Sequence, residues 1–418
     1  MKPTIVISSP VDTYSGYGAR SRDFIDAVIK LDKYNVKLLS QRWGNTRFGY
    51  CADHNRLDLS ALFIPNLDSK PDIWVQITVP NEFQAVGTYN IGVTAGIETT
   101  ICDQTWIQGV NRMDLTLTSS QHSKKVFLET KWELKDNRNG QVTQVAVNKP
   151  VEVLFEGVDI SKYFVTKSKL DLSNISESFC YLVVGHWLQG TYGNDRKNIG
   201  YTVKSFLETF KGKNNPPALI LKTSHSSTSL MDKSALLNKI DKIKKTVKGK
   251  LPNIYILHGD LTDEEVNWLY NHSKVKAMVT HTRGEGFGRP LLEFSMTGKP
   301  IIASGWSGQV DFLNSEYTSL LNGTLEKLDP SSVVKGVLLP DSQWFKVDDN
   351  AATKAYKMIF KHYKKYSGPA KKLKHENKTK YSFDAMVKSL NELIVKYVPS
   401  IKPQPKLNKL SLPKLKKV

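Results

Sequence analysis

Residues 276–304 constrain the fold of this 418-residue chain more than any other stretch. Residues 276–279 are mostly apolar, as expected for a strand that is buried on both faces of a parallel sheet. A glycine-rich turn follows, and the pattern then predicts a helix that begins at Pro290 and ends at Gly298. Residues 300–304 are typical of the next strand. The stretch therefore predicts a β-loop-α-β unit of a parallel α/β sheet.

The turn in this unit has the pattern Gly-Glu-Gly-Phe-Gly-x-Pro-x-x-Glu. Gly284, Gly286 and Gly288 let backbone amides approach a ligand, because they have no side chain. These amides and the positive end of the helix dipole favour a phosphate at this place. Glu285 and Glu293 can each accept two hydrogen bonds from neighbouring hydroxyl groups of a sugar. The structural alternative is a turn beside two solvated glutamates.

This pattern resembles the nucleotide-sugar motif of retaining GT-B glycosyltransferases of the group 1 or family 4 type. The resemblance implies an α/β protein with two Rossmann-like domains that face each other across a cleft. It also implies a nucleotide-sugar donor, a UDP- or GDP-sugar, and no other cofactor. In that family the first glutamate, here Glu285, lies beside the donor sugar, and the second, here Glu293, binds the nucleotide ribose. Gly286, Phe287 and Gly288 are then expected to contact the donor.

A basic segment matches the diphosphate site of the same family, with one departure. The family usually has Gly-Arg-Leu after the first strand of its second domain, and a lysine some residues later. Here His186 replaces the arginine, Lys197 matches the lysine, and Arg196 could supply the missing guanidinium. Lys222 ends a predicted buried strand, where a phosphate could serve as its partner. Positive charges stabilise a leaving nucleoside diphosphate. We therefore assign Lys197 and Arg196 to catalysis, together with Glu285, which the resemblance puts beside the donor sugar.

The first strand is followed by a Gly16-Tyr17-Gly18 loop and a helix, as at the start of a Rossmann-like domain. The third glycine and the acidic residue of a dinucleotide site are missing. In the resembled family this loop lies over the cleft, near the donor phosphates and the acceptor. Gly16 and Gly18 are therefore donor-binding candidates and Tyr17 is an acceptor-side candidate, with a purely structural turn as the alternative.

Three further candidates come from other segments that resemble the family. Residues 94–99 follow the carboxyl end of a predicted strand, where open α/β sheets place ligands, so Glu98 is an acceptor-side candidate. A carboxylate that only begins a helix is the alternative. His122, in the first turn of a predicted helix, is another acceptor-side candidate, although such histidines more often have structural roles. The backbone near Leu261 is expected to bracket the nucleotide base.

Chain length and the alternation of strands and helices predict two domains. We expect an N-terminal Rossmann-like acceptor-side domain at 1–165, a polar linker at 166–178 and a Rossmann-like nucleotide-sugar domain at 179–381. Residues 382–398 have helical periodicity and resemble the last helix of the family, which crosses back to the first domain. The prolines and lysines of 399–418 predict a flexible basic tail.

The net charge of +19 is concentrated near the C-terminus. Residues 351–380 hold ten Lys and one Glu, and residues 401–418 hold six Lys and no acidic residue. Such a surface can bind nucleic acid, an anionic membrane or an acidic polymer, or it can simply be a solvated face. Duplex DNA is thus a candidate partner for the Lys-rich region 351–418.

The sequence also argues against some classes of protein. It contains no apolar run as long as a membrane span, and its N-terminus lacks the pattern of a signal peptide. Cys51, Cys102 and Cys180 have no metal-ligand spacing and favour a reducing compartment. We therefore expect a cytoplasmic protein, in the host cytoplasm if it is viral, without a metal site.

Three functions are open at this point. The first is a retaining hexosyl- or pentosyltransferase that acts on a glycan, a protein or a lipid-linked acceptor. The second is a glycosyltransferase that acts on hydroxymethylated bases of phage DNA, since residues 15–22 resemble phage-encoded relatives. The third is a non-catalytic protein that binds nucleotide sugars or nucleic acid. The presence of both Glu285 and Glu293 argues against the third.

Overall fold

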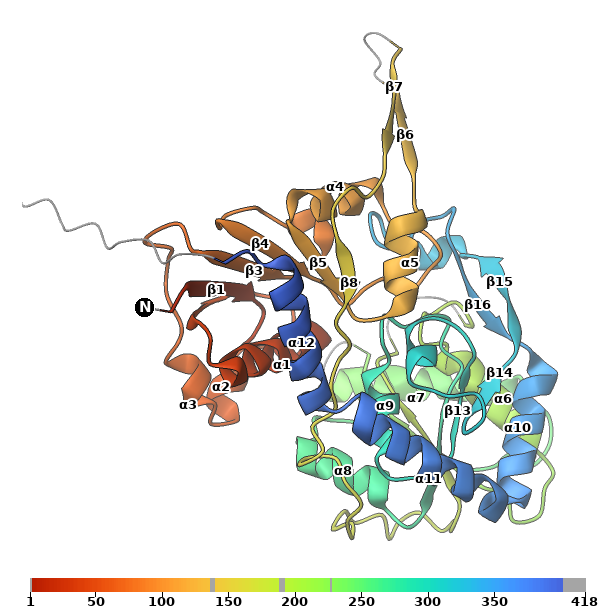
Figure 1. Cartoon of the computed structure of the whole chain (residues 1–418). Coiled ribbons are helices and arrows are strands. Elements are labelled where there is room, and N and C mark those ends of the chain that lie inside the picture. The colour runs from red at the N-terminus through yellow and green to blue at the C-terminus, as the bar shows by residue number, and fades with distance from the viewer. Residues whose placement is uncertain (1, 136–139, 188–191, 226–227, 401–418) are drawn as a thin grey trace, which may run out of the picture.

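The computed structural model describes residues 2–135, 140–187, 192–225 and 228–400. It contains two six-stranded sheets, and all neighbouring strands within each sheet are parallel. The sheets belong to two halves of the molecule that lie side by side (Figure 1). The predicted α/β class is confirmed.

The first half comes mainly from residues before 154. Its strand order is β2-β1-β3-β4-β5-β8. The strands are β1 (Thr4–Ser9), β2 (Asn35–Ser40), β3 (Ile73–Ile77), β4 (Tyr89–Val93), β5 (Leu115–Thr118) and β8 (Val151–Val153). The helices of this half are α1 (Gly16–Leu31), α2 (Tyr50–Asp53), α3 (Leu57–Ser60), η1 (Pro80–Glu82), α4 (Gln104–Arg112) and α5 (Gln121–Glu129).

The second half has the strand order β11-β10-β9-β12-β13-β14. These strands are β9 (Cys180–Val184), β10 (Ala218–Lys222), β11 (Ile254–Leu257), β12 (Val275–Thr280), β13 (Ile301–Ser304) and β14 (Ser319–Leu321). Its helices are α6 (Ile199–Phe210), α7 (Leu230–Lys245), α8 (Asp263–Asn271), α9 (Arg289–Ser295), η2 (Gly308–Asp311), η3 (Pro330–Ser332), α10 (Asp349–Lys361) and α11 (Tyr363–Lys380). The helix α9 begins at Arg289, one residue before the start predicted at Pro290, so Pro290 is its second residue.

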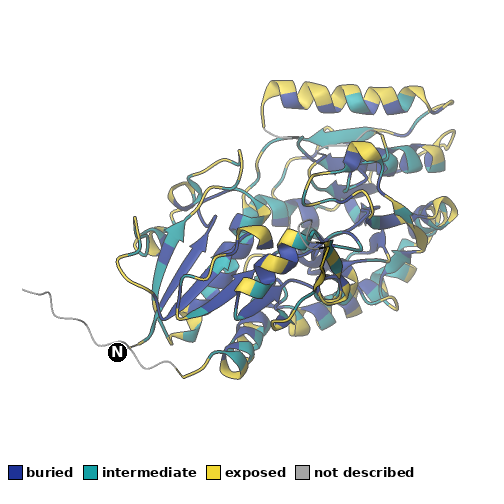
Figure 2. Ribbon diagram, turned by 90° about the horizontal axis from the view of Figure 1, so that it is seen from above, coloured by how far each residue is buried: buried dark blue, intermediate teal, exposed yellow. Residues whose placement is uncertain are grey.

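Buried apolar strands form the centre of each half, and the exposed residues lie mainly on the outer faces of the helices (Figure 2). In β1, for example, five of six residues are buried. Strands that are covered on both faces consist of nearly continuous apolar residues, which explains why the sequence pattern locates them.

The C-terminal helix α12 (Phe383–Tyr397) returns to the first half and packs against α1 (Figure 1). Its buried Met386, Leu390 and Ile394 belong to the core of the first half. An ion pair of 2.5 Å between Lys30 and Asp384 lies at the surface of this contact. The helix expected at 382–398 therefore ties the end of the chain to its beginning.

The chain passes from one core to the other earlier than expected. Val158 and Tyr163 belong to the core of the second half, and so do Leu172 and Ile175, from the segment 166–178 that we expected to be a linker. The core of the second half therefore begins near residue 158. Isolated apolar residues in a polar stretch show no periodicity, so their burial could not be predicted from the sequence.

Two antiparallel ribbons also join the fold, both from segments without a strong sequence pattern. The hairpin of β6 (Trp132–Lys135) and β7 (Val142–Val145) projects from the first half (Figure 1). The ribbon of β15 (Gly323–Lys327) and β16 (Gln343–Val347) lies on the second half. Most of the expected tail, residues 401–418, lies outside the described residues. Among the residues that are described, no helix combines the length and apolarity of a membrane crossing.

Candidate active site

A cavity of about 490 Å³ lies between the two halves and is lined by residues of both. Its lining segments follow the carboxyl ends of strands β1, β4, β9, β10 and β12, the edge where open α/β sheets bind ligands. Eleven of the fifteen predicted site residues line it. They are Gly16, Tyr17, Glu98, His186, Arg196, Lys197, Lys222, Glu285, Gly286, Phe287 and Gly288.

Glu285 and two cations form the centre of this cavity. Lys197 Nζ lies 2.7 Å from Glu285 Oε1 and 2.6 Å from Oε2, so it donates to both oxygens. Arg196 Nη1 lies 3.3 Å from Glu285 Oε2 and 3.5 Å from Glu98 Oε1, and it also donates to the carbonyl oxygen of Gly284 at 3.0 Å. The Glu285 side chain is only 10% exposed. The three residues that the sequence assigns to catalysis, Glu285, Lys197 and Arg196, thus lie in contact with one another.

The charged groups of this cluster shift the pKa values of one another. Burial raises the pKa of Glu285, but the charges of Lys197 and Arg196 outweigh it and lower that pKa below its usual value. Burial lowers the pKa of Arg196, and the carboxylates of Glu98 and Glu285 outweigh it and raise that pKa. Burial lowers the pKa of Lys197, against the opposing charge of Glu285. The shifts of Glu285 and Arg196 thus favour their charged forms.

His186 and Lys222 also line the cavity. His186 Nδ1 lies 2.8 Å from Ser224 Oγ. Burial lowers the pKa of His186, and the nearby charges of Lys197, Lys222 and Arg196 lower it further. Lys222 Nζ donates to the carbonyl oxygen of Gly259 at 2.5 Å. The residue in place of the family's arginine is thus a neutral imidazole beside three cations.

Two glycines of the turn also lie against the backbone of the first half. A Cβ atom at Gly284 would lie 2.0 Å from the carbonyl oxygen of Glu98, and one at Gly286 would lie 2.1 Å from that of Ala95. Both carbonyls belong to the first half. The glycines therefore allow the turn to touch the backbone of the other half. Gly288 has a φ of +99°, which favours glycine at the start of α9.

Tyr17 and Gly16 belong to the first turn of α1 at the rim of the cavity. The Tyr17 hydroxyl lies 2.9 Å from Thr94 Oγ1 and accepts a hydrogen bond from the amide of Ala95. The ring of Trp43 stacks on Tyr17, with 4.0 Å between the ring centroids. No atom lies within 4 Å of a Cβ built at Gly16, which leaves its backbone accessible from the cavity.

Glu293 does not line the cavity, although the resemblance implies contact with the ribose. It is 7% exposed, and its Oε1 accepts a hydrogen bond of 2.8 Å from Arg289 Nε. Arg289 lines the cavity and also pairs with Asp23 of α1 and, at 4.0 Å, with Glu156. Burial raises the pKa of Glu293 to about 7, against the opposing charge of Arg289.

Three other predicted residues also lie outside the cavity lining. Gly18 packs in α1, where a Cβ would lie 2.3 Å from the carbonyl oxygen of Thr13. Leu261 packs against the core of the second half. His122 Nε2 lies 3.2 Å from the carbonyl oxygen of Thr99, and burial lowers the pKa of the imidazole to about 4. Phe287 does line the cavity, but its ring packs on Phe312 at 4.9 Å.

Sequence reasoning missed four charged or aromatic residues of the cavity: Trp43, Glu156, Tyr270 and Arg289. Arg289 is the unspecified residue in the turn pattern. It lies four residues before Glu293, and this helical spacing could have predicted their contact. Glu156 and Trp43 lie in segments without a motif. Within the described part of the chain, no group of three or more His, Cys, Asp or Glu side chains is placed to hold a metal ion.

Comparison with solved structures tests the fold. A glycosyltransferase from Rickettsia africae covers 96% of this chain over its whole length, with a TM-score of 0.62 and 13% identity. Anabaena HepE in complex with UDP and glucose covers 94% over its whole length, with a TM-score of 0.60 and 14% identity. The chain has the GT-B fold.

A third GT-B structure, sucrose-phosphate synthase from Thermosynechococcus elongatus, matches 95% of the chain and 99% of its own length, with a TM-score of 0.59 and 10% identity. No family model matches the sequence, and no curated protein matches it either. The similarity therefore concerns the GT-B architecture, whose two halves enclose the cavity around Glu285.

Proposed function

We propose that this GT-B protein is a retaining glycosyltransferase that moves a sugar from a nucleotide-sugar donor to an acceptor hydroxyl. The observation that carries the proposal is the cluster of Glu285, Lys197 and Arg196 inside a cavity between the two halves. Binding of UDP and of UDP-glucose in the HepE structures of the same fold supports a UDP-sugar as the donor.

In this proposal the cations stabilise the departing diphosphate. Lys197, Arg196 and Lys222 all reach the cavity, and a desolvated site strengthens their attraction for developing negative charge. Arg196 provides a planar fork of donors, whereas the lysines provide point charges. The neutral His186 can donate one hydrogen bond without adding charge. Glu285, held by Lys197 and Arg196, would lie beside the donor sugar.

Glu293 requires a rearrangement to bind the ribose. In the structure Arg289 occupies one of its oxygens, and both side chains are largely buried. A ribose that replaces this contact would leave Arg289 to Asp23 and Glu156, which are already near it. In this proposal Arg289 holds the Glu293 carboxylate until a ribose replaces the contact.

The acceptor is proposed to bind over the first half. A cavity of about 360 Å³ adjoins the donor cavity, and Trp43 lines both. Its other lining residues include Gln41, Gln76 and Glu82, which can bind hydroxyl groups. This small, polar cavity favours a glycan or another compact hydroxylated acceptor over an intact DNA duplex.

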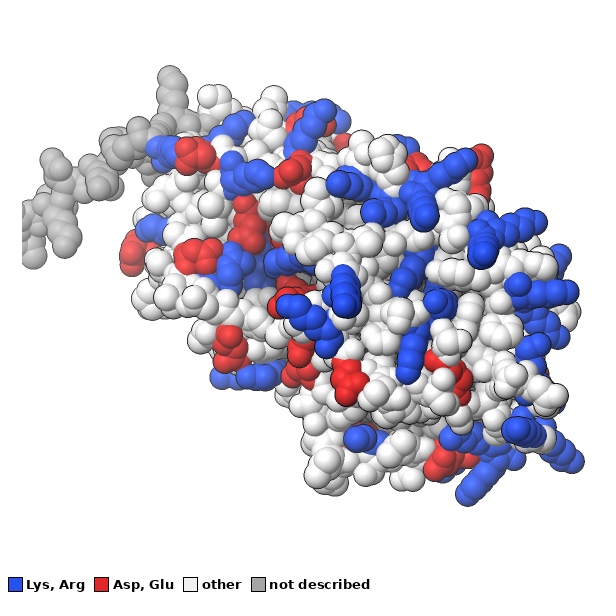
Figure 3. Space-filling model, turned by 90° about the horizontal axis from the view of Figure 1, so that it is seen from below, with Lys and Arg blue, Asp and Glu red and all other residues white. Residues whose placement is uncertain are grey.

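Hydroxymethylated DNA is the second candidate acceptor, and the charge distribution favours it. Figure 3 shows that Lys and Arg predominate on the surface of the second half of the molecule. The described lysines of α10 and α11 are mostly exposed, but none of them lines the donor cavity. DNA that contacts α11 would also have to extend into the cleft, with its target base turned out of the helix.

A screen of nucleotide sugars tests the proposal. Each donor is incubated with the full chain, and release of nucleoside diphosphate is measured with glycan acceptors and with duplex DNA that contains 5-hydroxymethylpyrimidines. We expect release with a UDP-sugar that depends on acceptor and is lost in Glu285→Gln. The absence of release and of UDP binding would contradict the proposal. Product analysis by NMR then reports retention or inversion at the anomeric carbon.

A further inference from the structure

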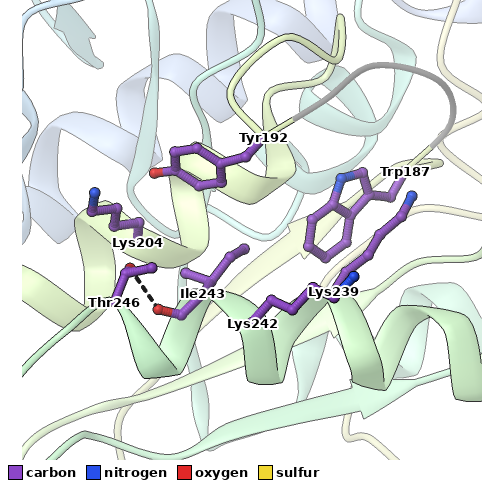
Figure 4. Close-up of a pocket in the computed structure, with 7 residues that line it drawn as sticks. All are labelled: Trp187, Tyr192, Lys204, Lys239, Lys242, Ile243 and Thr246. Carbon is purple, nitrogen blue, oxygen red and sulfur yellow. Dashed lines mark hydrogen bonds between the residues drawn. The ribbon is translucent and has the colours of Figure 1, made fainter.

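A second cavity, of about 430 Å³, lies within the second half (Figure 4). Its walls come from α6, from α7 and from the segment after β9. Trp187 and Tyr192 lie on one side, and Ile243 of α7 lies on the other. Among the described residues, no residue lines both this cavity and the donor cavity. The cavity is therefore a separate feature of the molecule.

Three lysines surround this cavity without a counter-ion. They are Lys204 from α6 and Lys239 and Lys242 from α7. In the described residues no carboxylate lies within 4.0 Å of any of the three amino groups, whereas other exposed lysines, such as Lys2, Lys30 and Lys211, are paired. Burial lowers the pKa of Lys239, with Asp195 and Asp232 opposing it only from a distance. An anion in the cavity would be a counter-ion for these ammonium groups.

Apolar surface separates the charges at the two ends. The ammonium group of Lys204 lies 5.4 Å from the centre of the Tyr192 ring, and that of Lys239 lies 5.3 Å from the Trp187 ring. Gly200 brings these rings close to α6, because a Cβ there would lie only 3.2 Å from Trp187 and 3.4 Å from Tyr192. The cavity thus combines an aromatic wall with positive charge at its rim (Figure 4).

We propose that this cavity binds a small organic phosphate that carries an apolar ring. The ring would pack between the two aromatic side chains and Ile243. The phosphate, with a charge near −2 at neutral pH, would lie beside Lys239 and Lys242 at one end of the cavity, and the charge of Lys204 at the other end would add to the attraction. A volume of about 430 Å³ holds a single small molecule of this kind rather than a polymer.

The occupant would also act on the donor cavity. Trp187 directly follows His186, which lines the donor cavity together with Arg196 and Lys197. The backbone amide of Trp187 donates to the carbonyl oxygen of Ser224, whose hydroxyl contacts His186. This part of the inference rests on the proposed function, whereas binding of the phosphate does not.

Calorimetric titration of the full chain with 1-naphthyl phosphate tests the binding. We expect Lys204→Ala/Lys242→Ala to weaken binding by about tenfold or more, since two of three charges are lost. The matched control is Lys233→Ala/Lys245→Ala, two exposed α7 lysines outside the cavity, and it should bind as the unmodified chain does. Inorganic phosphate and 1-naphthol alone should each bind more weakly than the combined probe.

Two results would overturn this site. One is binding that Lys197→Ala abolishes and Lys204→Ala/Lys242→Ala leaves unchanged, because the probe would then occupy the donor cavity. The other is binding only to vesicles that contain phosphatidic acid, which would indicate a membrane surface instead. The coupling is measured separately: saturating 1-naphthyl phosphate should change the Kd for UDP by about fivefold. An unchanged Kd for UDP contradicts the coupling, and a chain that binds the probe but no UDP contradicts the proposed function alone.

Discussion

At the scale of single residues, the charge balance of the site depends on Lys197. In the structure its amino group contacts both oxygens of Glu285, and Arg196 contacts one of the same oxygens. Removing Lys197 would leave Glu285 with a single partner and would take one positive charge from the proposed diphosphate site. The two cations are therefore not equivalent, since only Arg196 also contacts Glu98.

Replacement of Lys197 by alanine is expected to lower kcat by about 100-fold or more, as for the loss of one group that stabilises transition-state charge. Steady-state kinetics with the donor identified in the screen measure this. Lys213→Ala, which changes an exposed lysine outside the cavity, is the control. Equal kcat values for the two variants would remove Lys197 from the catalytic assignment.

The raised pKa of Glu293 predicts a pH-dependent stability. Its folded pKa is about 7, whereas a glutamate in an unfolded chain titrates near pH ~4.3. Between these values the folded state binds more protons, so the free energy of unfolding falls as the pH rises through this window. The loss is on the order of 2 kcal/mol.

Urea unfolding at pH 5 and pH 8 measures this effect. The unmodified chain should lose about 2 kcal/mol more over that interval than Glu293→Gln, which cannot titrate. All other carboxylates are shared by the two chains and cancel in the comparison. An identical pH dependence for both chains would show that Glu293 is already ionised at pH 5.

At the scale of elements, the turn before α9 joins the halves through its backbone. Gly286→Ala would place a methyl group against the carbonyl oxygen of Ala95, at a point where backbone must move to accommodate it. We expect a loss of about 1–3 kcal/mol in unfolding free energy and weaker donor binding. Gly368→Ala in α11, with nothing within 4 Å of the new atom, should be neutral or slightly stabilising. Thermal unfolding and UDP titration of both variants check this, and equal values would contradict it.

The elements differ in how well the sequence predicts them. The strand expected at 300–304 agrees with β13 (Ile301–Ser304) to within one residue, because buried parallel strands are continuous apolar runs. The hairpin β6–β7 and the ribbon β15–β16 were missed, since β6, β7 and β15 have only four or five residues each and none of these residues is buried, so no apolar run indicates them. Glu285 and Lys197 were expected to share a site from the family pattern. The contact of Arg289 with Asp23 joins residues 266 positions apart, and no local pattern reports such a contact.

At the scale of the whole molecule, α12 determines whether the first half is complete. Leu390 is fully buried in the core of that half although it lies near the end of the described chain. Leu390→Ala is expected to cost about 2–5 kcal/mol of unfolding free energy. Val395→Ala on the same helix, at a position 69% exposed, should change it by less than about 0.5 kcal/mol. Chemical denaturation measures both, and a small effect for Leu390 would indicate that α12 is dispensable.

The bridge from Arg289 to Asp23 has a consequence for how a donor enters. If the two halves separate, Asp23 moves away with the first, and the guanidinium remains on the second beside Glu293. The open molecule would then present to an arriving nucleotide a guanidinium that has lost Asp23 and keeps only Glu293 as its partner, and closing would return the second carboxylate to it. Attraction would thus be strongest before the donor is enclosed and weakest once it has been captured.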